Sequence, residues 1–237
     1  AFEPIVKVAK ANGIQRFIYA SSSSVYGVSD VPDVTEDHPL VPVTLYNKYK
    51  GMCEPILNSY GDDNFIVTSF RPATVCGYAP RLRLDLSVNI LTNHAITHNE
   101  IKVFGGMQMR PNLHIQDYCD AIKLLIKAPR KTIQQNVFNV GFQNMTIKDL
   151  AIMVRKVVLE EFPEKNKIDI VTTHSGDIRS YHINSQKIYN ALGFRPKHTI
   201  EDAIRSLCTA FKEGKAQDSM ENDNYYNIRT MQKLNLG

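Results

Sequence analysis

The feature that most constrains the fold is a short apolar segment that runs directly into four consecutive serines. Residues 16–20 (Arg-Phe-Ile-Tyr-Ala) have the composition of a buried parallel strand, and Ser21 to Ser24 follow without a break. In open α/β sheets, ligands bind at the carboxyl ends of the strands. The sequence therefore predicts an α/β fold in which this serine run lies in a ligand site.

A second motif, Tyr-x-x-x-Lys, follows 24 residues after Ser22, at Tyr46 and Lys50. If a helix begins at Thr44, the two side chains are i and i+4 and project from one face. A neighbouring cation favours the phenolate and lowers the pKa of a phenol from its ordinary value of about 10. Such a pair can remove a proton from an alcohol while hydride leaves the same carbon, which requires a nicotinamide acceptor.

Composition and charge limit the remaining functions. The chain has 237 residues, of which 43% are hydrophobic and 22% charged, with a net charge of +4. Its Lys and Arg residues are scattered, so we expect no nucleic-acid partner. The four cysteines form no Cys-x-x-Cys pair, and the seven histidines show no metal-ligand spacing. We therefore expect reduced thiols, a cytoplasmic location, no metal site and no association with a membrane.

The strand, the serines, Val25-Tyr26-Gly27 and the Tyr-x-x-x-Lys motif together resemble the extended short-chain dehydrogenase/reductase family, in particular its nucleotide-sugar epimerases and dehydratases. The resemblance implies that Ser22, Tyr46 and Lys50 are catalytic. Ser22 would contact the reacting oxygen, Tyr46 would be the base, and Lys50 would hold the nicotinamide ribose. It also implies NAD, or else NADP, as cofactor, with contacts from Ser21, Tyr46, Lys50, Arg71 and Pro72.

The resemblance further implies a nucleotide-sugar substrate. Arg110 would bind its phosphate, since a guanidinium pairs well with phosphate oxygens. Thr74 stands where most members of the family have asparagine, and Phe104 would either stack on the base or fill the core. Ser22 would belong to the substrate site as well. The implied substrate-binding residues are Ser22, Thr74, Asn89, Phe104, Arg110, Asp177 and Arg179.

The expected architecture is the C-terminal portion of a doubly wound Rossmann-type parallel sheet with an interleaved smaller α/β substrate lobe. Residues 1–77 and 111–141 would belong to the dinucleotide-binding part, residues 78–110 and 142–212 to the substrate lobe, and residues 213–237 to a peripheral or mobile polar tail. Because no Gly-x-Gly-x-x-Gly motif occurs, we expect the chain to correspond to the last two-thirds of such an enzyme. Relatives commonly form homodimers through the tyrosine helix, and we expect the same here.

The expected function is an NAD(P)-dependent epimerase that acts on a nucleotide-activated sugar through a transient keto intermediate. A nucleotide-sugar reductase uses the same three residues. A dehydratase of this family needs an acid pair where this chain has Ser23 and Ser24, which argues against that activity. The remaining alternative is an inactive truncated remnant that acts as a binding partner.

Two local expectations concern helices. Asp117 is expected to cap a helix over residues 118–128. Pro55 is expected to kink the helix that carries Tyr46, because it removes a backbone hydrogen bond to residue 51.

Overall fold

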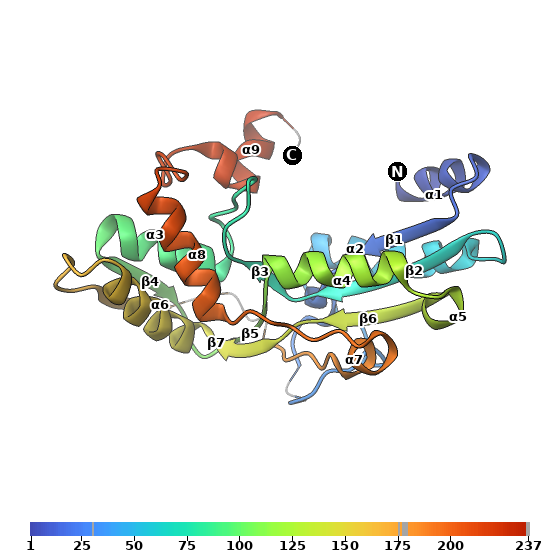
Figure 1. The fold of residues 1–237 in the computed structure, drawn as a ribbon, viewed down its shortest axis with the longest axis horizontal. Coiled ribbons are helices and arrows are strands. Elements are labelled where there is room, and N and C mark those ends of the chain that lie inside the picture. The colour runs from blue at the N-terminus through green and yellow to red at the C-terminus, as the bar shows by residue number, and fades with distance from the viewer. Residues whose placement is uncertain (30, 175, 177–179, 236–237) are drawn as a thin grey trace.

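The computed structural model describes residues 1–29, 31–174, 176 and 180–235. Two groups of elements occupy opposite ends of the long axis (Figure 1). One end holds a three-stranded parallel sheet with helices α1, α2 and α4, and the other holds α3, α6, α8 and β4. None of the helices among these described residues is long and apolar enough to cross a membrane.

The first sheet confirms the expected parallel α/β organisation. Its strand order is β1-β2-β6, and both pairings are parallel. The strands and the helices around them are β1 (Arg16–Ala20), β2 (Ile66–Pro72), β6 (Asn136–Val140), α1 (Phe2–Ala11), the 3-10 helix η1 (Ser23–Tyr26), α2 (Leu45–Tyr60), α4 (Ile115–Lys127) and α5 (Arg130–Ile133). The serine run thus begins where β1 ends, at the edge of the sheet where ligands bind in such folds.

The second group contains two small sheets. One has the order β3-β5-β7, and the other pairs β4 with β8 in parallel. The elements are β3 (Thr74–Cys76), α3 (Ser87–His98), β4 (Glu100–Phe104), β5 (Met109–His114), β7 (Gln143–Thr146), α6 (Ile147–Glu161), β8 (Asp169–Thr173), α8 (Ile200–Lys212), η2 (Asp223–Tyr225) and α9 (Asn227–Lys233). Helix α7 (Gln186–Leu192) lies beside β6 of the first group (Figure 1).

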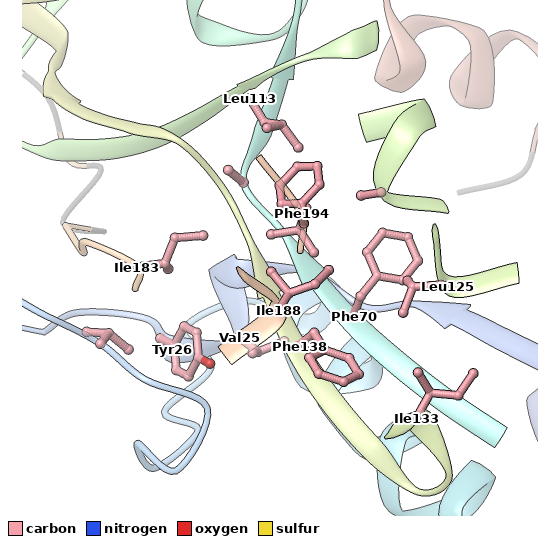
Figure 2. Close-up of a cluster of buried hydrophobic side chains, with 14 of the residues drawn as sticks. Val25, Tyr26, Phe70, Leu113, Leu125, Ile133, Phe138, Ile183, Ile188 and Phe194 are labelled. Atoms are coloured by element: carbon pink, nitrogen blue, oxygen red, sulfur yellow. The ribbon is translucent and has the colours of Figure 1, made fainter. Parts of the chain in front are cut away.

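Separate apolar clusters support the two groups. The cluster of the first sheet includes Phe70 from β2, Phe138 from β6 and Leu125 from α4, all at most 1% exposed (Figure 2). Ile188 and Phe194 also pack here, although we predicted them in the substrate lobe. A second cluster joins buried residues of α3, β4, α6 and α8. The predicted division into domains stays a prediction. Ile188, which we placed in the substrate lobe, packs against the sheet of the dinucleotide-binding part.

Helix α2 begins as the sequence predicts. Thr44 is its N-cap, and the Thr44 hydroxyl accepts a hydrogen bond from the Asn47 backbone N–H at 3.2 Å. Pro55 lies inside the helix, which nevertheless continues to Tyr60. Tyr46 and Lys50 therefore lie in the first half of one helix and share a face.

The predicted start of α4 is wrong. The helix begins at Ile115, and its N-cap is His114, whose Nδ1 accepts from the Gln116 backbone N–H at 3.0 Å. Asp117 lies inside the first turn, and its carboxylate accepts hydrogen bonds from residues 197 and 198. Asp117 therefore joins α4 to a distant part of the chain and is not its cap.

The C-terminal segment packs more tightly than a mobile tail would. Tyr226 is 7% exposed and packs with Leu82, Leu84 and Leu207. Its hydroxyl donates to the Ser219 carbonyl oxygen at 2.8 Å, and the Ser219 hydroxyl donates to Asn93 Oδ1 of α3 at 2.7 Å. A few anchored residues thus hold a mostly polar segment against α3.

Within the described residues, β1 pairs on one side only, with β2. A hollow of about 400 Å³ is lined by side chains that include Ile18 of β1, Phe70 of β2 and Ile122 of α4.

Candidate functional site

A chain of hydrogen bonds joins the serine run to the helix that carries the predicted base. The hydroxyls of Ser22 and Ser24 lie 2.7 Å apart, and the Ser24 hydroxyl donates to Asn47 Oδ1 at 2.7 Å. Asn47 is fully buried and directly follows Tyr46. The two motifs are therefore held together by direct contacts across 23 residues of sequence.

Tyr46 and Lys50 lie near each other at the carboxyl end of β1. The Lys50 Nζ atom is 5.8 Å from the centroid of the Tyr46 ring and 5.1 Å from that of the Tyr19 ring. It donates a hydrogen bond to the Ala20 carbonyl oxygen at 2.7 Å. Burial lowers the pKa of the Lys50 ammonium, which still places a positive charge beside two phenols. Tyr46 itself is 59% exposed and open to a ligand.

Arg71 lies in a buried network. Its guanidinium forms a two-pronged ion pair with Glu54 of α2, with nitrogen–oxygen distances of 3.0 and 2.6 Å. It also donates to the Tyr26 hydroxyl at 2.7 Å and to the Glu36 carbonyl oxygen at 3.0 Å. These bonds occupy the side chain that the resemblance assigned to the cofactor. Any cofactor contact at Arg71 would therefore have to come from its backbone, as at Pro72 beside it.

Two of the predicted substrate residues lie on or near β3. Thr74 is partly exposed and pairs with Asn112 of β5, so its hydroxyl remains a candidate contact. Asn89 is 3% exposed, and its side-chain amide forms hydrogen bonds to the backbone of this chain. Its Oδ1 accepts from the Gly77 N–H at 3.0 Å, and its Nδ2 donates to the Arg83 carbonyl oxygen at 2.8 Å. The structure thus makes Asn89 a support for the turn after β3.

The remaining substrate candidates differ in accessibility. Phe104 is 55% exposed at the end of β4, so the expectation that it could fill the core is wrong and its ring is available for stacking. Arg110 is 8% exposed on β5, and its guanidinium donates to the Met109 carbonyl oxygen at 3.0 Å. Asp177 and Arg179 lie outside the residues that the structure describes.

Sequence reasoning missed two residues that organise this site. Asn47 fixes the serine run to α2, and Glu54 neutralises Arg71. A signal for Glu54 was present, because it lies two turns after Tyr46 on the same helix and Arg71 lies near the end of a buried strand. Asn47 gave no such signal, since an amide beside a tyrosine is compatible with any exposed helix.

The residues present fit the nicotinamide end of a dinucleotide. The Ser21 hydroxyl is buried directly after β1 and has no hydrogen-bond partner among the described residues. A buried hydroxyl without a partner is costly, so a polar ligand group at this position would satisfy it. Ser21, Tyr46 and Lys50 would hold the nicotinamide and its ribose.

Comparison with known proteins agrees with this geometry. The sequence model of the NAD dependent epimerase/dehydratase family matches residues 2–141. The chain therefore belongs to this family. UDP-arabinose 4-epimerase 1 of Arabidopsis thaliana is 28% identical over 231 residues, which cover 88% of this chain and 53% of that protein. UDP-glucose 4-epimerase of Lactobacillus helveticus is 28% identical over 226 residues, covering 84% and 64%.

Solved structures support the same fold. UDP-glucuronic acid 4-epimerase from Bacillus cereus, in complex with UDP-glucuronic acid and NAD, superposes with a TM-score of 0.75 at 22% identity. The superposition covers 90% of this chain and 66% of that one. The chain thus spans about half to two-thirds of the length of the relatives it matches.

Proposed function

We propose that the chain carries the catalytic residues of an NAD-dependent epimerase that acts on a nucleotide-activated sugar. The observation that carries this proposal is the bonded connection from Ser22 through Ser24 to Asn47, beside Tyr46, with Lys50 one helical turn further on. These contacts hold the serine run against the helix that carries Tyr46, and the partly buried Lys50 ammonium lies 5.8 Å from the centroid of the Tyr46 ring.

Each of the three residues has a distinct task. Tyr46 removes the proton from a sugar hydroxyl and later returns it. Ser22 forms a second hydrogen bond to the same oxygen and so fixes its orientation. Lys50 stabilises the phenolate electrostatically, an effect that its partly buried position strengthens.

A bound NAD would supply the hydride acceptor, and later the hydride donor, for the carbon that bears this hydroxyl. Ser21 and Lys50 are the residues that we propose to hold the nicotinamide end. Arg110, Thr74 and Phe104 are the proposed contacts to the phosphate and base of the substrate, and Asp177 and Arg179 remain proposed contacts as well.

The test compares two tyrosine variants of one helix. Tyr46→Phe is expected to lower the rate of UDP-sugar epimerisation by about 10²–10⁴-fold, since that is the usual contribution of a general base. Tyr49→Phe is the matched control, because Tyr49 is 60% exposed three residues further along α2. Product epimers are measured by NMR after incubation with NAD. Equal rates in the two variants would contradict the proposal.

Binding of the cofactor is measured separately. The purified 237-residue chain is mixed with NAD, desalted and assayed for the retained dinucleotide. Retention is expected for a working nicotinamide site, whereas its complete loss would favour the alternative of an inactive remnant. This measurement does not require turnover.

The other activities of the family make different products. Ser23 is 1% exposed and the Ser24 hydroxyl donates to Asn47, so neither residue supplies the acid that a dehydratase needs. A reductase would consume NAD(P)H in proportion to product. An epimerase leaves the nicotinamide unchanged after each turnover, so the absorbance of reduced nicotinamide separates the two.

We also propose that two copies of the chain associate through α2. Leu45 and Met52 lie on this helix and are at least half exposed, which is unusual for apolar side chains this close together. Sedimentation equilibrium would detect the dimer. Met52→Glu is expected to weaken it, and a wild-type chain that stays monomeric at high concentration would contradict this part of the proposal.

A further inference from the structure

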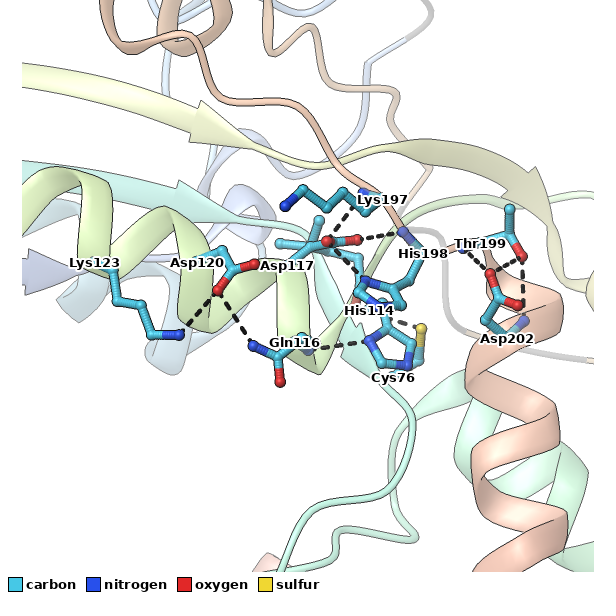
Figure 3. Close-up of polar contacts among 11 residues, drawn as sticks. Cys76, His114, Gln116, Asp117, Asp120, Lys123, Lys197, His198, Thr199 and Asp202 are labelled. Carbon is cyan, nitrogen blue, oxygen red and sulfur yellow. Dashed lines mark hydrogen bonds and ion pairs between the residues drawn. The ribbon is translucent and has the colours of Figure 1, made fainter.

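A cluster of titratable residues joins the start of α4 to the connection between α7 and α8 (Figure 3). The rings of His114 and His198 stack with their centroids 4.6 Å apart and their planes inclined by 21°. His114 ends β5, and His198 lies just before α8. Two histidines far apart in sequence therefore meet where the two groups of elements adjoin.

Asp117 holds the connection in place. Its carboxylate is 1% exposed and accepts hydrogen bonds from the backbone N–H groups of Lys197 at 3.0 Å and His198 at 2.9 Å. It also lies 3.0 Å from His198 Nδ1. Because a carboxylate only accepts, the proton of this last bond belongs to His198.

The His114 ring accepts a hydrogen bond, whereas the His198 ring donates one. Its Nδ1 accepts from the Gln116 backbone N–H at 3.0 Å, so this nitrogen must remain unprotonated. Protonation of His114 would remove the N-cap of α4. It would also place a positive charge at the positive end of the helix dipole. The His198 ring instead donates from Nδ1 to Asp117.

We propose that His114 and His198 form an acid-sensitive clasp that holds residues 197–199 against the first turn of α4 at neutral pH and releases them in acid. A proton on His114 Nδ1 would break the bond from the Gln116 N–H. The stacked geometry places that change directly against the His198 ring, which lies next to the bonds from Lys197 and His198 to Asp117. The clasp is independent of the proposed epimerase activity.

The groups that face His114 come from four parts of the chain. Asp117 comes from α4, Asp202 from α8 and His198 from the connection, while Cys76 is its register partner on β3. Burial and then His198 lower the pKa of His114, and Asp117 and Asp202 oppose this shift only in part. Burial raises the pKa of Cys76 to about 12, so its thiol stays neutral throughout.

The size of the expected effect follows from the coupling between proton binding and opening of the clasp. When the clasp opens, the burial that lowers the pKa of His114 is lost, so the open form binds a proton more readily than the closed form. For a group whose ordinary pKa is 6.5, this favours opening at pH 5.5 by up to about tenfold more than at pH 7.5. The protection factors of the Lys197 and His198 amides, which donate to Asp117, are therefore expected to fall by up to about tenfold between these two pH values.

Hydrogen exchange followed by NMR on the full chain tests this expectation, with protection factors corrected for intrinsic exchange. His114→Asn retains a good N-cap acceptor but does not titrate, so the fall should disappear. His114→Asp serves the same purpose if the Asn variant folds poorly. His94→Asn is the matched control, because His94 is a partly buried histidine on α3 whose pKa burial also lowers.

The control should leave the fall at residues 197 and 198 unchanged. The proposal is overturned if wild-type protection does not depend on pH, or if His114→Asn shows the same fall. The second result would show that the acid response does not come from His114. Neither readout depends on turnover, so failure of the clasp and failure of the proposed activity are distinguished.

Discussion

The ion pair between Arg71 and Glu54 allows a quantitative test of how the site is held together. The side chains are 6% and 4% exposed, and the Arg71 Nη2 and Glu54 Oε2 atoms are 2.6 Å apart. In Glu54→Ala the guanidinium stays buried and keeps only the Tyr26 hydroxyl and the Glu36 carbonyl oxygen. Removing one partner of a buried pair typically costs about 3–5 kcal/mol.

We expect the lower end of this range, about 3 kcal/mol, because two hydrogen bonds to Arg71 survive the change. With a urea m-value of about 2 kcal/mol/M, the midpoint of unfolding would fall by roughly 1.5 M. Circular dichroism in a urea titration measures this shift. Glu100→Ala is the matched control, because Glu100 forms an exposed pair with Lys102 at 3.7 Å and should cost less than about 1 kcal/mol.

The double variant Glu54→Leu with Arg71→Met separates the cost of leaving a buried charge unpaired from the cost of losing the ion pair itself. It removes both charges, so no unpaired guanidinium remains buried, and we expect its stability to lie closer to wild type than that of Glu54→Ala. If Glu54→Ala were no more destabilising than Glu100→Ala, the claim that Arg71 needs Glu54 to neutralise its buried charge would be wrong.

Three further predictions concern stability. Gly27→Ala should lower the melting temperature more than Gly13→Ala, because both glycines have φ above 70° but only at Gly27 would a Cβ atom lie 1.9 Å from the Val41 carbonyl oxygen; equal shifts would exclude the clash. Thr199→Ala should cost about 1 kcal/mol in urea unfolding by removing the capping box of α8; an unchanged midpoint would contradict this. Burial lowers the pKa of His94 below its ordinary 6.5, so the unfolded chain binds the proton first and stability falls as the pH drops below about 6.5. His94→Asn should therefore reduce the difference between urea midpoints at pH 7.5 and 5.5, and a variant with the full wild-type difference would refute the assignment.

The sequence was most informative where structure is local. The strand before the serines and the Thr44 cap each follow from a few adjacent residues. The exposure of Phe104 was also readable, because Ile101 and Val103 are buried on β4 and alternate with Lys102 and Phe104. A period of two places Phe104 on the same face as a lysine.

The sequence was least informative where the partner is distant. Strand β7 contains Gln143 and Asn144, which have little preference for strands, and it forms because it pairs with β5. The role of Asn89 depends on the Arg83 carbonyl oxygen and on the Gly77 backbone, which composition does not reveal. The cap of α4 was misplaced because histidine is a less usual cap than aspartate.

The bond from Lys50 to the Ala20 carbonyl oxygen affects the thermodynamics of ligand binding. A free lysine side chain loses about 1.5–2 kcal/mol of rotamer entropy when it is fixed in one place. Here that loss accompanies folding, because the ammonium is already anchored at the end of β1 with two N–H donors left over. A ribose hydroxyl that reaches Lys50 therefore meets a donor that is oriented in advance, and calorimetry should show a smaller entropic penalty for the wild-type chain than for a variant in which this anchor is lost.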